Sequence, residues 1–384
     1  AQKIIDLSGK WSFSIDRQDN GEKEKWFSHT LNDFINLPGS MPEKLKGDEV
    51  TAKTQWTGSL YDSSYYYNPY MEKYRKEGNI KFPFFLTPDK HYVGAAWYQK
   101  EVNIPADWKG ERILLFLERP HIETTVWVNG QKTGMQNSLC VPHQYDITHY
   151  VRPGKCTITI RVDNRIKEIN VGPDSHSITD QTQGNWNGIV GRICLQTTPK
   201  TYFDDIQIYP EPEQKLARVK VVIKGTGTAK VKLSAESFNT DKKHIVPAIQ
   251  QEIKLNKGVT ETEMVLPMGN DMLLWDEFHP ALYKLKAEVT NGKKTEIKEI
   301  QFGMRRFEIK GKWFYVNGRK TQLRGTVENC DFPLTGYAPM DVESWERVFR
   351  ICRSYGLNHM RFHSFCPPEA AFMAADRVGF YLQP

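Results

Sequence analysis

Six cysteines occur in this 384-residue sequence, and their spacing decides what chemistry they can do. No two of them form a C-x-x-C pair, which argues against a disulfide scaffold and against a structural zinc site. Buried free thiols are the simpler interpretation, and the redox compartment stays open. No set of His, Asp and Glu has metal-ligand spacing, and no glycine-rich phosphate loop stands out, so we predict no metal and no other cofactor. The six are Cys140, Cys156, Cys194, Cys330, Cys352 and Cys366.

A tyrosine-rich stretch between about residues 56 and 91 offers a different chemistry. Its first part reads WTGSLYDSSYYYNPYMEKYRKEGNIKFPFF. Aromatic rings have apolar faces that suit the C–H surfaces of sugars. A rim loop that packs on its own side chains is the competing interpretation. Because the stretch is long and irregular, we interpret it as an insertion rather than as core. Its candidate platform residues are Tyr61, Tyr65, Tyr66, Tyr67 and Tyr70.

The first 200 residues or so are typical of an all-β domain. AWYQKEVNIP, ERILLFLERP, ETTVWVNGQKTG and CTITIRVDNR alternate apolar and polar residues and are separated by turn residues. Asn129-Gly130 predicts a tight hairpin, because a type I′ turn needs positive φ at both central residues. Such spacing favours a β-sandwich of the jelly-roll kind.

Two further segments follow. ARVKVVIKG, AKVKLSAESF, TETEMVLP and LYKLKAEVT lie between about residues 201 and 303 and predict an immunoglobulin-like sandwich. After Gly303, FYVNGRKTQLRGT predicts a hairpin followed by a strand. DVESWERVFRICRSYG and PPEAAFMAADRVG then predict helices, and LNHMRFHS and FYLQP predict two more strands. Asp341 is the expected N-cap of the first helix and Gly356 the expected residue after its end. The order β-α-β-α-β is typical of the start of a parallel α/β domain.

Composition and charge exclude several classes of function. The formal net charge of +6 is spread over a large surface, and lysine clusters such as GEKEKW contain acids, so we expect no nucleic-acid partner. No apolar run approaches the roughly 20 residues that a membrane span needs. The sequence begins AQKIIDLSGKW, which suits a mature protein after removal of a signal peptide, although a cloning boundary explains it equally well. We expect a secreted or periplasmic protein.

The order of the domains and several strings resemble glycoside hydrolase family 2, the group of β-galactosidases, β-glucuronidases and β-mannosidases. GAAWYQKEVNIPADWKGERILLFLERPHIETTVWVNGQKTG is similar to its sugar-binding domain, and GNWNGIVGRICLQTTP and YFDDIQIYP to that domain's end. FGMRRFEIKGKWFYVNGRKTQLRGT, GLNHMRFHSF and AADRVGFYLQP resemble the first strands of its barrel. The resemblance implies a mainly β chain with a jelly-roll sugar-binding domain (1–199), an immunoglobulin-like sandwich (200–303) and the first β-α-β-α-β of a truncated (β/α)8 TIM barrel (304–384).

Retaining hydrolysis of O-glycosidic bonds in oligosaccharides or polysaccharides is the activity that the resemblance implies. Such sites hold two carboxylates about 5–5.5 Å apart, one as nucleophile and one as general acid and base. In this family both are Glu residues on the fourth and seventh barrel strands, whereas the sequence stops at the third. We therefore expect the catalytic pair beyond residue 384 and no activity from this chain alone.

Sugar contacts are expected from one loop of the first domain, SITDQTQGNWNGIVGR. The family places an Asp there, and Asp180 is the best match, with Gln181 and Asn185 beside it. A carboxylate can accept two hydroxyl hydrogen bonds from a sugar. An Asx turn that starts the loop is the alternative for Asp180. Trp186 either stacks on a sugar ring or packs under the loop.

Further substrate contacts are expected at the barrel strands. The resemblance places Arg324 and Arg361 near the active-site floor, although pairing with barrel carboxylates would also explain a buried Arg. Glu328, at the end of the first strand, is either a substrate contact or a rim carboxylate. The other expected contacts, which depart from the histidines of β-galactosidases, are Asn329, His363 and Ser364.

Two other classes of function compete with an enzyme. A non-catalytic carbohydrate-binding or adhesion protein could use the two sandwiches, but it would not need the βα units at the end of the chain. A structural spacer is the weaker alternative. For the enzyme and for the binding protein, the expected partner is a carbohydrate. Because three strands cannot close an eight-stranded barrel, we also expect self-association through its unpartnered surfaces.

Overall fold

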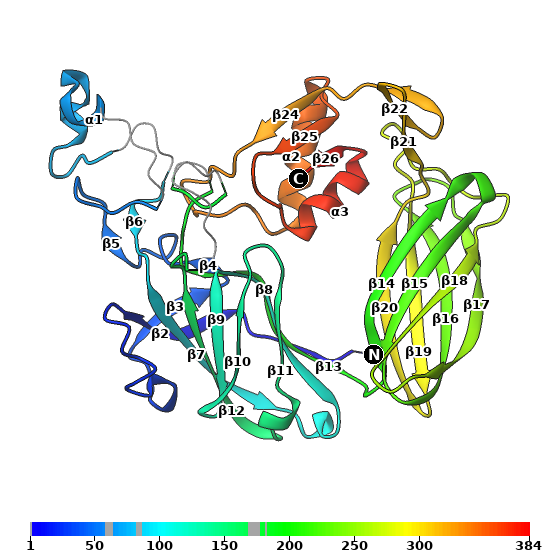
Figure 1. Cartoon of the computed structure of the whole chain (residues 1–384), viewed down its shortest axis with the longest axis horizontal. Coiled ribbons are helices and arrows are strands. Elements are labelled where there is room, and N and C mark those ends of the chain that lie inside the picture. Colours follow the sequence, from blue (N-terminus) through cyan, green and yellow to red (C-terminus); the bar gives the residue numbers. More distant parts are fainter. Residues whose placement is uncertain (1, 58–63, 82–86, 168–176, 181–182) are drawn as a thin grey trace.

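The computed structural model describes residues 2–57, 64–81, 87–167, 177–180 and 183–384. Three bodies follow one another along the chain (Figure 1). Two are β-sandwiches that stand side by side, and the third is a smaller α/β segment that lies over the gap between them and contains the carboxyl end. Strands dominate the structure, as the sequence predicts.

The first sandwich consists of two antiparallel sheets. One has the order β1-β13-β8-β11, with β4 beside β13, and the other has the order β10-β9-β12-β7-β2-β3. Their strands are β1 (Ile4–Asp6), β2 (Gly9–Asp16), β3 (Asp33–Leu37), β4 (Gly39–Ser40), β7 (Ala95–Ile104), β8 (Arg112–His121), β9 (Glu123–Val128), β10 (Gln131–Asn137), β11 (His143–Asp146), β12 (Gly154–Asp163) and β13 (Gly188–Thr198). The short elements around them are the pair β5 (Asp48–Glu49) and β6 (Lys90–His91), the helix α1 (Ser64–Tyr67), and the 3-10 turns η1 (Trp26–Ser28), η2 (Pro69–Tyr74), η3 (Ala106–Trp108) and η4 (Thr148–Tyr150).

Alternation of side chains explains the core between these two sheets. Trp11, Tyr98, Leu115 and Ile160 point inward and are fully buried. The predicted hairpin is present, because Val128 pairs with Gln131 and the residues between them, Asn129 and Gly130, have φ of 50° and 78°. The two sheets are therefore held together by a shared apolar core, and the turn between β9 and β10 is made by residues that suit its positive φ angles.

The second sandwich also has a core formed by alternating side chains, and its alternation of buried and less buried residues is more regular. In β15 every second residue, Ala217, Val219, Val221 and Ile223, is fully buried. The sheets have the orders β14-β15-β18 and β17-β16-β19-β20. The elements are β14 (Tyr202–Glu211), η5 (Pro212–Gln214), β15 (Leu216–Lys224), β16 (Gly227–Phe238), β17 (Ile245–Leu255), β18 (Val259–Pro267), β19 (Leu282–Asn291) and β20 (Lys294–Phe302).

The α/β segment begins with a small antiparallel sheet and continues with three parallel strands. The order β-α-β-α-β that the sequence predicts is present, and β24 and β26 pair in parallel on either side of β25. The elements are β21 (Phe307–Lys310), β22 (Trp313–Val316), β23 (Arg319–Thr321), β24 (Gly325–Glu328), α2 (Val342–Ser354), β25 (His359–Phe362), α3 (Glu369–Val378) and β26 (Tyr381–Gln383).

Both helices begin and end where the sequence predicts. The Asp341 carboxylate accepts a hydrogen bond of 2.8 Å from the Ser344 backbone N–H, which caps α2. Gly356 and Gly379, with φ of 82° and 83°, follow the two helix ends in the left-handed conformation that favours glycine. The helices pack on one face of the parallel strands, around Phe349.

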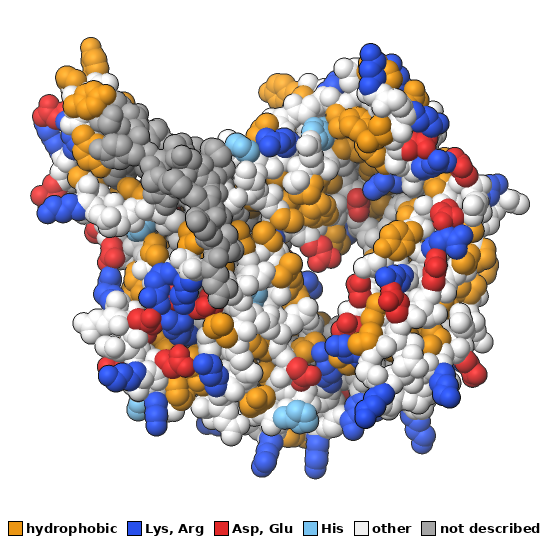
Figure 2. Space-filling view, viewed as in Figure 1, with side chains coloured by type: hydrophobic (Ala, Val, Ile, Leu, Met, Phe, Trp, Pro, Cys, Tyr) orange, Lys and Arg blue, Asp and Glu red, His pale blue; other side chains and the backbone are white. Residues whose placement is uncertain are grey.

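The α/β segment makes polar contacts with the second sandwich. The Trp275 indole N–H donates to the Asp376 carbonyl at 2.8 Å. Arg353 donates to the carbonyls of Glu277 and Val378, at 2.5 and 2.9 Å. Below this contact, Figure 2 shows an opening between the two sandwiches. The ends of α2 and α3 thus hold the α/β segment against the second sandwich. On its other side the segment contacts the first sandwich.

Candidate functional site

The expected sugar-contacting loop lies where the first sandwich meets the α/β segment. Asp180, Asn185 and Trp186 are all buried, with exposed fractions of 6%, 4% and 6%. Gln181 lies outside the described residues. The three described residues therefore face protein, and the structure shows what each of them contacts.

Asp180 fastens two distant segments of the first sandwich together. One carboxylate oxygen accepts the Thr57 backbone N–H at 2.7 Å, and the other accepts the Asn185 backbone N–H at 3.3 Å. The His91 Nε2 atom lies 3.6 Å from the first oxygen. Both oxygens are engaged within the protein, which fits a loop-forming role. Sugar contact by Asp180 stays a prediction.

Asn185 joins this loop to the end of β8. Its amide N–H groups donate to the Asn164 carbonyl at 2.8 Å and to the Thr57 hydroxyl at 3.1 Å. Its amide oxygen accepts from His121 Nε2 at 3.0 Å. Burial lowers the pKa of His121 to about 4, so the imidazole is neutral at physiological pH. The site thus contains a neutral histidine that is fixed in one tautomer.

Trp186 packs under the loop, between the first sandwich and the α/β segment. Its ring stacks on His121 at a centroid distance of 4.6 Å, and it lies 5.5 Å from the Tyr337 ring. Gly336, at φ 88°, lies beside the indole, and a Cβ added there would be in ordinary contact with it at 3.5 Å. Packing is therefore the role that the geometry shows for Trp186.

A small cavity of about 20 Å³ remains at this junction, lined by Trp56, His91, Asp180, Trp186 and Phe332 among others. Such a volume suits about one water molecule. A sugar ring does not fit there.

The strand ends of the α/β segment bring together four of the predicted residues. Glu328 is the last residue of β24 and Asn329 follows it, and His363 and Ser364 follow β25. His363 Nδ1 lies 3.1 Å from the Asn329 amide oxygen, and the His363 backbone N–H donates to the Glu328 carbonyl at 2.8 Å. Ser364 has a φ of 66° and is exposed. This cluster lies at the carboxyl ends of parallel strands, where α/β folds bind their ligands.

The strand register separates Glu328 from Arg361. Glu328 pairs with Phe362, which belongs to the helix-covered core, whereas Arg361 pairs with the exposed Val327. Because side chains alternate along a strand, Glu328 faces the helices and Arg361 faces the open side of the sheet. Burial and the nearby Asp331 charge raise the pKa of Glu328. Its carboxylate accepts the Cys330 backbone N–H at 2.7 Å, which fits the rim-carboxylate alternative.

The structure places Arg324 away from the strand ends that carry Glu328 and His363, and its contact with substrate stays a prediction. Arg324 precedes β24, so it lies at the opposite end of that strand from Glu328. Its guanidinium donates to the Gly356 carbonyl at 2.8 Å and lies 4.0 Å from Glu277. Arg324 has this position because a loop follows β23 and β24 begins only at Gly325. Arg324 supports the contact with the second sandwich.

Three contacts that the sequence analysis missed hold the first sandwich against the strand-end loops. The Ser40 hydroxyl donates to the Thr335 carbonyl at 2.5 Å, and the Tyr337 hydroxyl donates to Glu43 at 2.8 Å. Arg119, in β8, donates to the Cys366 carbonyl at 3.0 Å. The partners are more than 240 residues apart, so no local pattern could have indicated them. His121 was also missed; a His at the end of an apolar strand was the available signal.

The tyrosine-rich insertion is described only in part, and Tyr61 lies outside the described residues. Tyr65 is fully buried, and its hydroxyl donates to the Tyr74 carbonyl at 3.0 Å, as expected for a loop that packs on itself. Tyr67 and Tyr70 are 72% and 83% exposed. These two rings are therefore accessible to a ligand.

Comparison with known proteins identifies the family. The sequence profile of the glycosyl hydrolases family 2 sugar binding domain matches residues 4–199, about half of the chain. A second profile, described as glycosyl hydrolases family 2, matches residues 201–305. The chain therefore belongs to glycosyl hydrolases family 2, as its motifs indicate.

Individual relatives are distant but cover nearly the whole chain. A β-glucuronidase of Homo sapiens is 23% identical over 99% of this chain and 56% of its own length, and one of Paenibacillus borealis is 23% identical over 98% and 58%. The structure of a β-glucuronidase from Ruminococcus gnavus in complex with D-glucaro-d-lactam aligns with a TM-score of 0.72 at 19% identity, over 99% of this chain and 59% of that one. The chain thus spans little more than half the length of these relatives.

No helix in the described part is both long and apolar enough to cross a membrane. Within the same ranges, no three His, Cys, Asp or Glu side chains gather in a way that could hold a metal ion.

Proposed function

We propose that this chain is the amino-terminal part of a retaining glycoside hydrolase that acts on O-glycosidic bonds of oligosaccharides or polysaccharides. In this proposal, residues 1–199 and 200–303 form the jelly-roll and immunoglobulin-like domains, and residues 304–384 begin a (β/α)8 barrel. The named relatives make β-glucuronides and β-galactosides the first substrates to test. The two catalytic carboxylates would come from sequence after residue 384.

The observation that carries the proposal is the contact between the first sandwich and the loops that follow β24 and β25. Ser40 and Glu43 bind the first of these loops, and Arg119 binds the second. In (β/α)8 enzymes the active site lies at this carboxyl-terminal face. A sugar-binding domain in this position can supply part of the wall of the substrate site.

Arg361 and His363 are the residues of the α/β segment that best suit such a site. Arg361 lies on the sheet face that the helices leave open, and His363 lies at the strand end beside Asn329. A guanidinium binds carboxylate or hydroxyl oxygens of a sugar, and an imidazole can donate or accept one hydrogen bond. Glu328 faces the helices, and in this proposal it serves as a carboxylate at the rim of the site.

The experiment compares the product of the whole open reading frame with the 384-residue chain. Hydrolysis of nitrophenyl β-D-glucuronide and β-D-galactoside is followed by absorbance, and the first-formed anomer is followed by proton NMR. We expect hydrolysis with retention from the longer protein and none from the chain. Turnover by the chain, or an inverted product, would contradict the proposal. Glycan binding without hydrolysis by the longer protein would instead favour a carbohydrate-binding or adhesion protein.

Self-association of the chain is part of the same proposal. β24 and β26 are the outer strands of a three-stranded parallel sheet, and Val327 on the open face is 54% exposed. Unpaired strand edges favour pairing with another chain. Light scattering over a range of concentrations should show dimers of the 384-residue chain, and a monomer at every concentration would contradict this part.

A further inference from the structure

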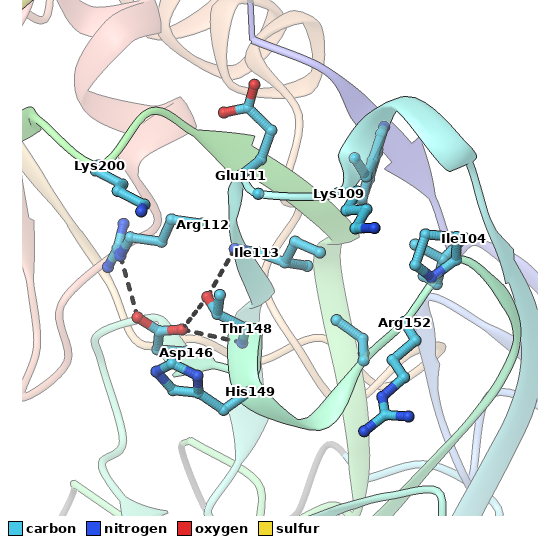
Figure 3. Close-up of a pocket in the computed structure, with 14 residues that line it drawn as sticks. Ile104, Lys109, Glu111, Arg112, Ile113, Asp146, Thr148, His149, Arg152 and Lys200 are labelled. Atoms are coloured by element: carbon cyan, nitrogen blue, oxygen red, sulfur yellow. Dashed lines mark hydrogen bonds and ion pairs between the residues drawn. The ribbon is translucent and has the colours of Figure 1, made fainter.

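A cleft of about 730 Å³ opens at the far end of the first sandwich (Figure 3). Its floor is apolar and is formed by Ile104, Trp108, Ile113 and Val151, which come from β7, η3, β8 and the residue after η4. Trp108 is only 3% exposed, so the floor is a well-packed surface. We call this feature the end cleft. Its volume lies within the range of roughly 300–1,000 Å³ that is usual for ligand pockets.

The rim of the end cleft carries three positive charges that lack a partner. Among the described residues, no ion pair involves Lys109, Arg152 or Lys200, and all three are exposed. In Figure 3, Lys200 lies on one side of Ile113, and Lys109 and Arg152 lie on the other. The rim therefore presents cations from two sides.

The remaining charged groups of the end cleft neutralise one another. Arg112 donates to Asp146 at 3.2 Å, and its guanidinium lies 3.8 Å from the centre of the Tyr202 ring. Glu111 pairs at 3.1 Å with Lys294 of the second sandwich. Both acids of the lining are thus paired. An anionic ligand would meet three cations and no unpaired carboxylate.

The end cleft is distinct from the junction with the α/β segment. Arg112 begins β8 and His121 ends it, and this strand has ten residues. At about 3.3 Å per residue, its two ends are roughly 30 Å apart. The end cleft therefore does not belong to the candidate site described above, and it adjoins the second sandwich through Lys200, Tyr202 and Lys294.

We propose that the end cleft binds an anionic oligosaccharide, one whose sugars carry carboxylate or sulfate groups. Sugar rings have apolar C–H faces, and the exposed ring of Pro153 in the lining can meet one of them. Their acidic groups would reach Lys109 and Arg152 on one side and Lys200 on the other. Charge-assisted hydrogen bonds to such groups are stronger than neutral ones. A single small anion would use only one side of the rim, so an extended ligand with repeated charges fits better.

Two other classes of anionic partner fit less well. Proteins that bind single-stranded nucleic acids offer exposed aromatic rings on which bases stack. Apart from the imidazole of His149, the aromatic ring in the described lining is that of Trp108, which is buried. Proteins usually bind a membrane surface through exposed large apolar side chains, and no residue of the described lining is one of these. The lining therefore favours a saccharide.

The test is calorimetric titration of the 384-residue chain with four probes at low salt. An oligogalacturonate tetramer carries carboxylates, a carrageenan tetrasaccharide carries sulfates, a β-1,4-galactotetraose is neutral, and a 20-nucleotide poly(dT) represents nucleic acid. We expect binding of at least one of the two acidic oligosaccharides and none of the neutral one. The acidic probe that binds tighter identifies the preferred group. Raising the salt concentration should weaken binding, because exposed charges are screened.

The variant Lys109→Ala/Arg152→Ala/Lys200→Ala should weaken binding of the acidic probe at least tenfold. Its matched control, Lys23→Ala/Lys155→Ala/Lys257→Ala, removes the same net charge from exposed positions outside the end cleft and should stay within twofold. All six side chains are exposed, so both variants should fold, which thermal unfolding checks.

Several outcomes would overturn the inference. They are absence of binding by both acidic oligosaccharides, equal binding of the neutral one, tighter binding of poly(dT), and equal weakening by the two triple variants. Because no step measures hydrolysis, this inference and the glycosidase proposal can fail independently.

Discussion

The Trp186 indole stacks on the His121 imidazole at a centroid distance of 4.6 Å and an interplanar angle of 26°. The pair connects the end of β8 to the loop after β24, because Gly336 lies against the same indole. One side chain therefore joins the sugar-binding domain to the α/β segment. This contact makes Trp186 the residue on which the junction should depend most.

Trp186→Ala should lower the free energy of unfolding by about 3 kcal/mol, the usual cost of truncating a buried aromatic residue. Hydrogen exchange at Thr335–Tyr337 should become faster, because that loop loses its support. Urea unfolding and exchange mass spectrometry measure the two effects. Trp313→Ala, at a Trp that is 41% exposed, is the control and should cost much less. Equal costs for the two variants would contradict the packing role.

His121 should make stability depend on pH. Burial lowers its folded pKa to about 4, below the ordinary value of 6.5. The unfolded state therefore binds a proton that the folded state does not, and stability is lost as pH falls from 6.5 towards 4. The loss should reach roughly 3 kcal/mol, since one pKa unit corresponds to about 1.4 kcal/mol.

The variant His121→Gln isolates this contribution, because Gln can keep the donor to Asn185 but does not titrate. It should be less stable than the parent at pH 7.5, yet lose less stability on acidification. Urea unfolding at pH 7.5, 5.5 and 4.5 measures both slopes. His29→Gln, at an exposed histidine, should leave the slope of the parent unchanged. Parallel curves for the parent and His121→Gln would refute the assignment.

Much of the fold could be predicted because the relevant signals are local. Alternation in β15, the Asn129-Gly130 turn and the Asp341 cap each depend on residues close in sequence. The family strings supply the order of the domains. Helix ends were predictable for the same reason, since Gly379 adopts the left-handed conformation that few other residues tolerate.

The site was less predictable because its contacts are not local. Asp180 matches a family position, yet its carboxylate binds the backbone of Thr57, which lies 123 residues away. Arg324 lies at the opposite end of β24 from Glu328, which the motif did not indicate because it does not reveal where strand pairing begins. The unpaired cations of the end cleft come from separate turns and a linker, so they form a pattern only after folding.

Glu328 should destabilise the folded state at neutral pH. Burial and the neighbouring Asp331 raise its folded pKa above the ordinary value of 4.5. The folded state then retains a proton that the unfolded state has released, so stability falls as pH rises from 4.5 through the folded pKa. Glu328→Gln, which can still accept the Cys330 N–H, should be more stable than the parent at pH 7 and equal to it near pH 4.

Thermal unfolding at the two pH values measures the Glu328→Gln effect. Glu343→Gln is the matched control, because Glu343 is exposed in the first turn of α2. Its loss should cost no more than about 0.5 kcal/mol at pH 7, through the helix dipole. A destabilised Glu328→Gln protein at pH 7 would show that the carboxylate is favourably paired, contrary to the geometry described here.

Arg119 should hold the first sandwich against the loop that precedes α3. Its guanidinium donates to the Cys366, Pro367 and Cys140 carbonyls at 3.0, 3.4 and 3.1 Å. A hydrogen bond from a charged donor contributes about 1.5–3 kcal/mol. The three bonds share one guanidinium and are only partly buried, so we expect Arg119→Ala to cost about 2 kcal/mol in all. Hydrogen exchange in the first turn of α3 should become faster in the same variant.

Arg119→Lys tests whether the fork shape of the guanidinium matters. An ammonium group keeps the charge but cannot reach three carbonyls in that fixed geometry, so it should recover less than half of the lost stability. Arg192→Ala is the control on the neighbouring strand β13, because the Arg192 guanidinium pairs with Glu118 and lies over the Phe116 ring, both in β8. It should leave exchange in α3 unchanged. Unaltered exchange in Arg119→Ala would mean that Ser40, Glu43 and Trp186 suffice to hold the junction.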